Sequence, residues 1–161
     1  EDVMIRTELR SGDLGYVIYL HGKLYKMEND YGLAFEAYVA AGLAEFYQQY
    51  KPEVERVWIC EFDQRIIGFM LLMKRGEYAQ LRFFVLEPEF RGIGLGNRLL
   101  RSFLDFMSEA GYSKAYLWTT NELPASAHLY RKFGFKVTEE HPSTSWGKAV
   151  VEQRYELHLG K

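Results

Sequence analysis

RGIGLGNRLL, residues 91–100, places three glycines at alternate positions directly before the start of an amphipathic pattern. An ordered glycine loses more backbone freedom than any other residue, so three glycines this close together are unfavourable unless the main chain serves another purpose. Without side chains, another group can approach the main chain closely. The start of a helix also has free N–H groups and a partial positive charge, and the stretch therefore predicts an anion site.

A strand precedes the glycines, and a helix and a second strand follow them. Residues 78–87, YAQLRFFVLE, form an apolar strand pattern, and the helix after the glycines has one apolar face that ends before Gly111. The apolar positions of that face are Leu99, Leu100, Phe103, Leu104, Met107 and Ala110. Residues 114–120, KAYLWTT, predict the next strand, and a strand, a helix and a strand in this order form a right-handed parallel crossover.

The other elements follow from periodicity and from polar breaks. Helical patterns cover about residues 14–25, 35–50 and 124–133, and strand patterns cover residues 4–9, 55–62, 65–73, 135–140 and 150–159. Residues 140–148, EHPSTSWGK, are predicted to be a polar loop. Short breaks between the three strands from 55 to 87 favour an antiparallel meander. We predict one α+β (mixed α/β) domain over residues 1–161, with a twisted, mostly antiparallel sheet of six to seven strands, one parallel crossover and about four flanking helices.

Composition excludes several classes of protein. The 161 residues have a formal charge of -2 and no polybasic stretch, so no nucleic-acid contact is expected. The longest apolar run, residues 66–73, is too short to cross a membrane. Cys60 is the only cysteine, which excludes an intrachain disulfide and a cysteine-based zinc site and fits a cytoplasmic location. The histidines lack metal-ligand spacing, so no metal is predicted.

Spacing separates three phosphate-binding patterns that glycines of this kind can form. A P-loop requires a lysine and then Ser or Thr after its last glycine, whereas Asn97 follows Gly96. The dinucleotide pattern G-x-G-x-x-G fails in both frames, because it needs a glycine at Asn97 or at Leu99. The pattern R-x-x-G-x-G fits without gaps at Arg91, Gly94 and Gly96. The alternative to a ligand site is a turn whose small residues only pack a strand against a helix.

This pattern, within FVLEPEFRGIGLGNRLL at residues 84–100, resembles the cofactor-binding loop of the GCN5-related N-acetyltransferase (GNAT) family. HLYRKFGF, at residues 128–135, resembles a later signature of the same family. The resemblance covers about the whole chain. It implies the GNAT fold and an enzyme that moves an acetyl group from acetyl coenzyme A (acetyl-CoA) to a primary amine, by direct attack in a ternary complex.

Further stretches resemble the acetyltransferase half of bacterial proteins in which this enzyme is fused to a MarR-type regulator. They are LWTT, AHLYRKFGF, TEE, WG and EQRYEL. This resemblance implies a bacterial protein, a domain cut from a longer chain, and association with a MarR-type regulator. Dimers are common in the family, so a homodimer is also implied.

The resemblance implies a role for each part of the motifs. Tyr130 matches the family tyrosine that can protonate the departing thiolate, and the N–H of Leu86 is the candidate for polarising the thioester. The main chain of Phe84, Val85 and Leu86 is expected to bind the pantetheine arm, and Ser126 is a further candidate for binding the cofactor. The pyrophosphate is expected to bind mainly the main-chain amides of Arg91, Gly92, Ile93, Gly94, Leu95, Gly96 and Asn97.

Two positions depart from the family pattern. Gln80 stands where some members have a glutamate, and because it cannot take a proton we name no general base. Leu123 stands where the family often has an asparagine, and Asn121 is instead expected to cap the following helix. Gln80 keeps a noncatalytic acetyl-CoA sensor open as the alternative to an enzyme. His21, on an apolar helix face, is expected to be a satisfied core residue, and Trp146 is a candidate wall of the acceptor pocket.

The acceptor itself is open at this point. A small metabolite, an antibiotic, a peptide N-terminus and a protein lysine all present the primary amine that the family implies. No membrane partner is expected.

Overall fold

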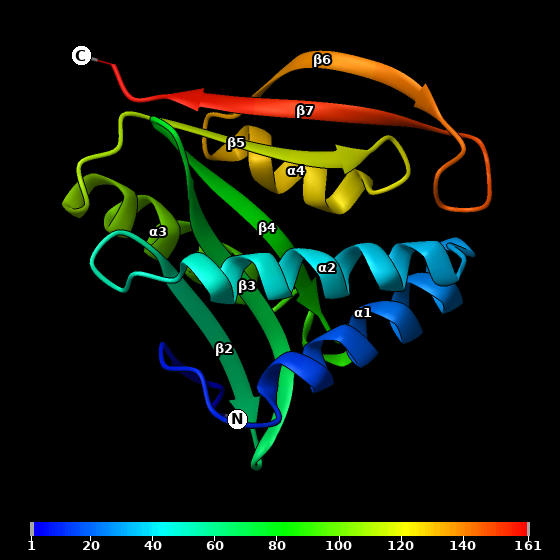
Figure 1. Cartoon of the computed structure of the whole chain (residues 1–161), viewed down its shortest axis with the longest axis horizontal. Helices are drawn as coiled ribbons and strands as arrows, with labels where there is room; N and C mark the ends of the chain where they lie inside the picture. Colours follow the sequence, from blue (N-terminus) through cyan, green and yellow to red (C-terminus); the bar gives the residue numbers. More distant parts are fainter. Residues whose placement is uncertain (1, 161) are drawn as a thin grey trace.

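A seven-stranded sheet runs through the molecule, with helices on both of its faces (Figure 1). The computed structural model describes residues 2–160, and the strand order is β1-β2-β3-β4-β5-β7-β6. The strands are β1 (Met4–Arg6), β2 (Arg56–Phe62), β3 (Arg65–Arg75), β4 (Tyr78–Leu86), β5 (Lys114–Thr120), β6 (Lys136–Ser143) and β7 (Val150–His158). The helices are α1 (Asp13–Asn29), α2 (Leu33–Gln49), α3 (Leu95–Glu109) and α4 (Pro124–Lys132), with a short 3-10 turn at Pro88–Phe90.

Among the described strands, β4 and β5 form the one parallel pair, and all other neighbours are antiparallel. α3 connects the two parallel strands. The predicted fold class is therefore confirmed: a mixed α+β fold with a mostly antiparallel sheet of seven strands, one parallel crossover and four helices. The meander of β2, β3 and β4 is confirmed with it.

The sheet has a separate apolar core on each face. α1 and α2 cover one face, and α3 and α4 cover the other (Figure 1). Along β3 the side chains alternate between the two cores, with Phe69 and Leu71 on the α1 and α2 side and Met70 and Leu72 on the α3 side. Because both faces are buried, this strand is a nearly continuous apolar run in the sequence.

β4 and β5 separate after a short paired stretch. Their register covers only Tyr78 to Gln80 on β4 and Lys114 to Tyr116 on β5, while β5 stays paired with β7 as far as Thr120. A bulge in β4, opposite residues 69–71, accompanies the separation. Within it Phe83 has φ 63°, a left-handed conformation that bulky residues rarely adopt. The two strands diverge from a common end in Figure 1, so the sheet is open between their later halves.

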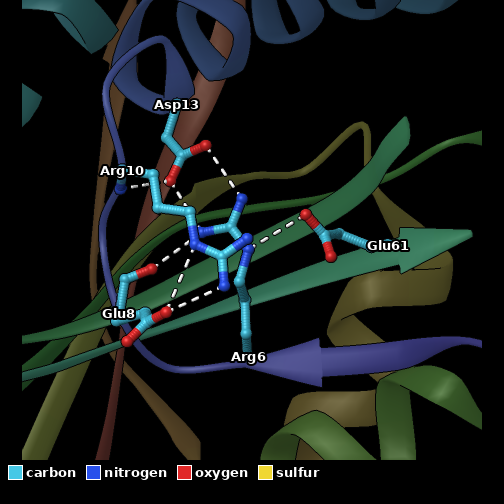
Figure 2. Close-up of polar contacts among 5 residues, drawn as sticks. All are labelled: Arg6, Glu8, Arg10, Asp13 and Glu61. Atoms are coloured by element: carbon cyan, nitrogen blue, oxygen red, sulfur yellow. Dashed lines mark hydrogen bonds and ion pairs between the residues drawn. The ribbon is translucent and has the colours of Figure 1, made fainter. Parts of the chain in front are cut away.

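An ion-pair network ties the first strand to α1 and β2 (Figure 2). Arg6 donates both terminal nitrogens to Asp13, at 2.8 and 2.9 Å, and its Nε to Glu61 at 2.9 Å. Asp13 also accepts the main-chain N–H of Arg10 at 2.7 Å. Burial alone would raise the pKa of Asp13, but the hydrogen bonds from Arg6 and Arg10 lower it below its usual value. The carboxylate therefore stays charged at neutral pH and fixes the start of α1 to the sheet.

Two local predictions are wrong. Residues 140–143, predicted as part of a loop, belong to β6, and Pro142 is tolerated there because β6 is an edge strand. Asn121 does not cap α4, whose N-cap residue is Leu123. The Asn121 side chain instead accepts the N–H of Val151 at 2.9 Å and so extends the pairing of β5 with β7.

Candidate functional site

The glycine loop, residues 91–97, leads from β4 into α3, and the main-chain amides of Gly92 to Asn97 are free. Gly92 and Gly94 have φ 78° and 86°, in the left-handed region that favours glycine. Within residues 2–160, no protein group accepts from the amides of Gly92 to Asn97, and the next amide, that of Arg98, donates to Gly94 O at 3.1 Å. A Cβ on Gly94 would meet no atom within 4 Å. Free amides at a helix start, with open space above them, support the predicted anion site.

The two ends of the glycine loop are fixed by other elements. The Arg91 guanidinium donates to both carboxylate oxygens of Glu28 on α1, at 3.0 Å each, and to Leu86 O at 2.8 and 3.0 Å. At the other end, a Cβ on Gly96 would lie 3.1 Å from Leu129 on α4, so glycine permits the close packing. The Arg91 side chain is thus bonded to protein groups. Its main-chain N–H also donates to Pro88 O, at 3.2 Å, so Arg91 fixes the loop and offers no free amide.

A cleft of about 680 Å³ lies over the glycine loop, and we call it the loop cleft. Its walls come from α1, the end of β4, the glycine loop and the start of α4. The predicted cofactor-binding residues in its walls are Phe84, Val85, Leu86, Arg91, Gly92, Gly94, Gly96, Asn97 and Ser126. Ile93 and Leu95 do not line the loop cleft, because the Ile93 side chain is 61% exposed and the Leu95 side chain is buried in the core. These two residues can contribute only main-chain groups.

The end of β4 presents main-chain groups to the opening in the sheet. The N–H of Glu87 points toward β3 and donates to Ile67 O at 2.8 Å. Val85, two residues earlier and paired with Phe69, directs its main-chain groups the same way, toward β3. Because this direction alternates along an antiparallel strand, the N–H and C=O groups of Leu86 face the opening between β4 and β5. The bond from Arg91 to Leu86 O agrees with this direction. Phe84 lies inside the bulge and has no register partner on either neighbouring strand. The N–H of Leu86 and the main chain of Phe84, which is unpaired in the register, are the candidates for binding a ligand.

A second cavity, of about 420 Å³, adjoins the loop cleft, and we call it the aromatic cavity. Its aromatic residues are Tyr25, Tyr31, Phe35, Tyr38, Phe83, Phe84, Trp118, Tyr130 and Trp146. Many of these rings contact one another, as Tyr38 and Trp146 do at 5.0 Å between centroids. Tyr25, Phe84, Leu123 and Ser126 line both cavities, so the two meet at these residues.

Tyr130, the predicted proton donor, lies in the wall of the aromatic cavity. The residue is 5% exposed, and burial, with a smaller effect from Tyr25, raises its pKa well above the usual value. Neighbouring Ser126 offsets part of this rise. At neutral pH the phenol therefore keeps its proton and is present as a hydrogen-bond donor.

Sequence reasoning missed most of the walls of the aromatic cavity, and among the missed residues are Tyr25, Arg82 and Glu152. Tyr25 lies where the two cavities meet, and burial raises its pKa to about 12. Arg82 comes from β4 and Glu152 from β7. The sequence does contain a signal for Arg82, because it is a charged residue in the middle of the apolar strand YAQLRFFVL.

The expectation that His21 is a satisfied core residue is wrong in part. His21 is 1% exposed, and its Nδ1 donates to Val17 O at 2.9 Å, but its Nε2 has no partner within residues 2–160. The ring lines the aromatic cavity, and burial lowers its pKa to about 4, so it is neutral at neutral pH.

Gln80 lines the same cavity, and its Oε1 accepts from Arg75 at 2.9 Å.

Within residues 2–160, no three His, Cys, Asp or Glu side chains are grouped so that they could bind a metal ion. None of the helices in this part of the chain has the length and hydropathy needed to cross a bilayer.

The chain is similar to known acetyltransferases in sequence. The acetyltransferase (GNAT) family matches residues 24–135, which include the glycine loop and Tyr130. Human N-acetyltransferase 8B is 28% identical over 99 residues, which cover 58% of this chain and 44% of that protein. A protein of Schizosaccharomyces pombe described as an N-acetyltransferase is 34% identical over 63 residues, 39% of each chain. The matched part spans less than half the length of these curated relatives.

Solved structures with the same fold contain the family's cofactor. A Bacillus anthracis protein described as a streptothricin acetyltransferase, solved with acetyl-CoA, is 25% identical with a TM-score of 0.61, covering 71% of this chain and 68% of that one. Spermidine N-acetyltransferase from Vibrio cholerae, solved with CoA and spermine, is 23% identical with a TM-score of 0.68, covering 98% and 95%. Acetyl-CoA is the cofactor of such GNAT proteins, and the free amides of the glycine loop fit its phosphates. The family match over residues 24–135 shows that the chain belongs to the GNAT family of acetyltransferases.

Proposed function

We propose that the chain is an acetyl-CoA-dependent N-acetyltransferase, which moves the acetyl group to a primary amine by direct attack in a ternary complex. The observation that carries the proposal is the meeting of two cavities at the opening between β4 and β5. The loop cleft has free amides for an anion, and the aromatic cavity has walls suited to an organic acceptor. A thiol-release assay with a panel of amines tests it.

The residues of the loop cleft fit the phosphates and the pantetheine arm of acetyl-CoA. The amides of Gly92 to Asn97 bind the pyrophosphate, aided by the dipole of α3. The free main-chain groups of Phe84 and Leu86 bind the amides of the pantetheine arm, as an added strand would, while Val85 contributes apolar surface. Ser126 offers a hydroxyl where the two cavities meet. Bound acetyl-CoA supplies an activated acetyl thioester.

Two main-chain N–H groups can polarise the thioester carbonyl. Leu86, the candidate from the sequence, lines the loop cleft, whereas Phe84 lines both cavities. The acceptor amine has to reach the thioester from the aromatic cavity, so we assign the thioester oxygen to Phe84 N–H and the pantetheine arm to Leu86 N–H. A donor fixed at the oxygen where negative charge develops stabilises the transition state.

Tyr130 protonates the departing thiolate. Its raised pKa keeps the phenol protonated at neutral pH, and Tyr130 lines the same cavity as Phe84 and Ser126. Placing one proton donor at a leaving group contributes about 10²-fold to 10⁴-fold in rate.

Removal of the Tyr130 hydroxyl tests this role. We expect Tyr130→Phe to lower kcat by about 100-fold, while the calorimetric affinity for CoA changes little. Tyr47→Phe is the matched control, because Tyr47 is 61% exposed on α2 and lines neither cavity. If Tyr130→Phe keeps the wild-type kcat and its pH profile, Tyr130 is not the general acid.

A noncatalytic acetyl-CoA sensor is the second candidate, and Gln80 favours it. Gln80 cannot take a proton, and its bond to Arg75 holds it in place. A sensor would bind CoA in calorimetry and release no acceptor-dependent thiol with any amine at any pH. Thiol release with an amine favours the enzyme.

Five further features stay predictions from the sequence: one domain over residues 1–161, a cytoplasmic location, a bacterial origin, a homodimer, and association with a MarR-type regulator.

A further inference from the structure

Arg82 places a guanidinium in the wall of the aromatic cavity, with its side chain 10% exposed. The bulge in β4 explains this position. Leu81 packs into the core on the α3 side, whereas Phe83 packs on the α1 and α2 side, and Arg82 pairs with Leu71 of that same side. Two successive side chains, Arg82 and Phe83, therefore face α1 and α2.

Aromatic and neutral groups hold the Arg82 guanidinium. Its Cζ lies 4.4 Å from the ring centre of Phe83 and 5.4 Å from that of Tyr38, and Nη2 donates to the Tyr38 hydroxyl at 3.1 Å. Nη1 lies 3.7 Å from the sulfur of Met73. Nε is buried and has no acceptor within residues 2–160. The side chain is thus fixed in place without a hydrogen bond to a carboxylate.

The nearest carboxylate is already committed to another arginine. Glu45 accepts from Arg75 at 2.7 and 3.1 Å, and its distance to Arg82 Nη1 is 3.7 Å. Gln80, the next polar group of β4, is neutral and bonded to Arg75. Two guanidinium groups thus share one carboxylate beside the cavity. A positive charge this deeply buried with an incomplete partner is unfavourable, and an incoming anion would relieve it.

A carboxylate lies on the other side of the opening in the sheet. Glu152 of β7 is half-buried, lines the same cavity, and accepts no hydrogen bond or ion pair within residues 2–160. β5 lies between β7 and the opening, so Arg82 and Glu152 approach the cavity from opposite sides. The cavity therefore offers one cation and one anion to a ligand.

The aromatic cavity is small, and aromatic rings form much of its walls. Tyr31, Phe35 and Trp146 stand in the walls, with Phe35 packed against both of the others at 5.3 Å between centroids. A volume of about 420 Å³ suits a small metabolite rather than a folded protein segment. A ligand complementary to this cavity has a carboxylate, an ammonium group and an apolar side chain.

This inference rests on the proposed function: we propose that the acceptor is a free α-amino acid with an apolar or aromatic side chain. Its carboxylate pairs with Arg82, its ammonium group is drawn to Glu152, and its side chain packs among Tyr31, Phe35 and Trp146. In the transfer, the amine nitrogen bonds to the acetyl carbon and the carbon–sulfur bond breaks. The ammonium group loses two protons. One leaves to solvent, and the other replaces the proton that Tyr130 gives to the thiolate. The products are an N-acetylamino acid, CoA and H⁺.

Thiol release with matched acceptors tests the proposal. The pairs are L-phenylalanine with phenethylamine, L-leucine with isoamylamine, and L-tryptophan with tryptamine, which differ within each pair by the carboxylate. We expect kcat/KM to be at least about 100-fold higher for the amino acid in at least one pair, because an analogue without the carboxylate leaves Arg82 unpaired. Higher kcat/KM for the decarboxylated amine in every pair would overturn the proposal.

Variants at the two charges give a second readout. Arg82→Gln should lower kcat/KM for the preferred amino acid about 100-fold and that for its decarboxylated partner less than about 3-fold. Arg82→Lys should recover part of the loss, and Glu152→Gln should raise KM for the amino acid. Calorimetry of the amino acid with the CoA-bound protein should lose its binding heat in Arg82→Gln. An equal loss for both acceptors in every Arg82 variant would show a merely structural role and would contradict the proposal.

The outcomes separate this proposal from the proposed function. Acetylation of amines, with amino acids rejected, overturns the acceptor class and leaves the enzyme intact. CoA binding with no acceptor-dependent thiol from any amine or amino acid overturns both.

Discussion

Phe83 is the residue whose conformation does most to shape the site. A left-handed φ in a bulky residue is unfavourable by about 1–3 kcal/mol and persists where the surroundings enforce it. Here the bulge turns Phe83 and Arg82 toward α2, and Gly42 of α2 leaves room for both. A Cβ on Gly42 would lie 2.8 Å from Phe83 Cε2 and 3.0 Å from Arg82 Nη2.

Gly42→Ala is therefore expected to lower the melting temperature. In an unobstructed helix, replacing glycine by alanine raises the free energy of unfolding by about 1 kcal/mol. A loss of stability in Gly42→Ala would therefore be opposite to the usual effect. Gly15 of α1 is the matched control, because a Cβ there would meet no atom within 4 Å, and Gly15→Ala should raise the melting temperature. Thermal unfolding measures both variants. Equal stabilisation by the two would mean that Phe83 does not pack against α2 in solution.

At the scale of elements, β1 depends on charge as much as on apolar packing. It has three residues, and Arg6 joins it to Asp13 at the start of α1 and to Glu61 on β2 (Figure 2). The side chains of Arg6 and Asp13 are 14% and 6% exposed, so removal of one leaves a buried charge without its partner.

Asp13→Asn is expected to lower the free energy of unfolding at pH 7 by about 3 kcal/mol. Because the folded-state pKa of Asp13 lies below 3.8, this stabilisation is present at neutral pH and is lost as the pH falls from about 3.8 through the lower folded value. Urea denaturation of both proteins should show the difference at pH 7 and a much smaller one near pH 2.5. Glu8→Gln, which alters an exposed pair with Arg10, is the control and should change stability by less than about 0.5 kcal/mol. An undiminished difference in acid would contradict the ion pair.

At the scale of the whole molecule, the fold class and the glycine loop were predicted, and the assembly of the aromatic cavity was not. The strand, the glycine loop and α3 are contiguous, so Gly92, Gly94 and the helix after them could be found from spacing alone. The aromatic cavity draws on residues as far apart as Tyr25 and Glu152, which the sheet order brings together. No local pattern contains that information. Arg82 lies between the two cases, because its charge is visible in the strand but its direction depends on the bulge.

The separation of β4 and β5 connects the loop cleft with the aromatic cavity. The sequence predicts that the two strands are parallel neighbours, and the structure adds that they pair over three residues each. The opening beyond Gln80 exposes the main chain of Phe84 and Leu86 and lets the loop cleft meet the aromatic cavity. A fully paired sheet would bury the same main-chain groups in hydrogen bonds.

The most direct test of the account is a crystal structure of the protein with CoA bound. The account predicts the pyrophosphate within hydrogen-bond distance of the amides between Gly92 and Asn97, and the pantetheine arm along Phe84 and Leu86 in the opening beside β4. A pyrophosphate bound elsewhere, or β4 and β5 closed against each other along their full length, would contradict it.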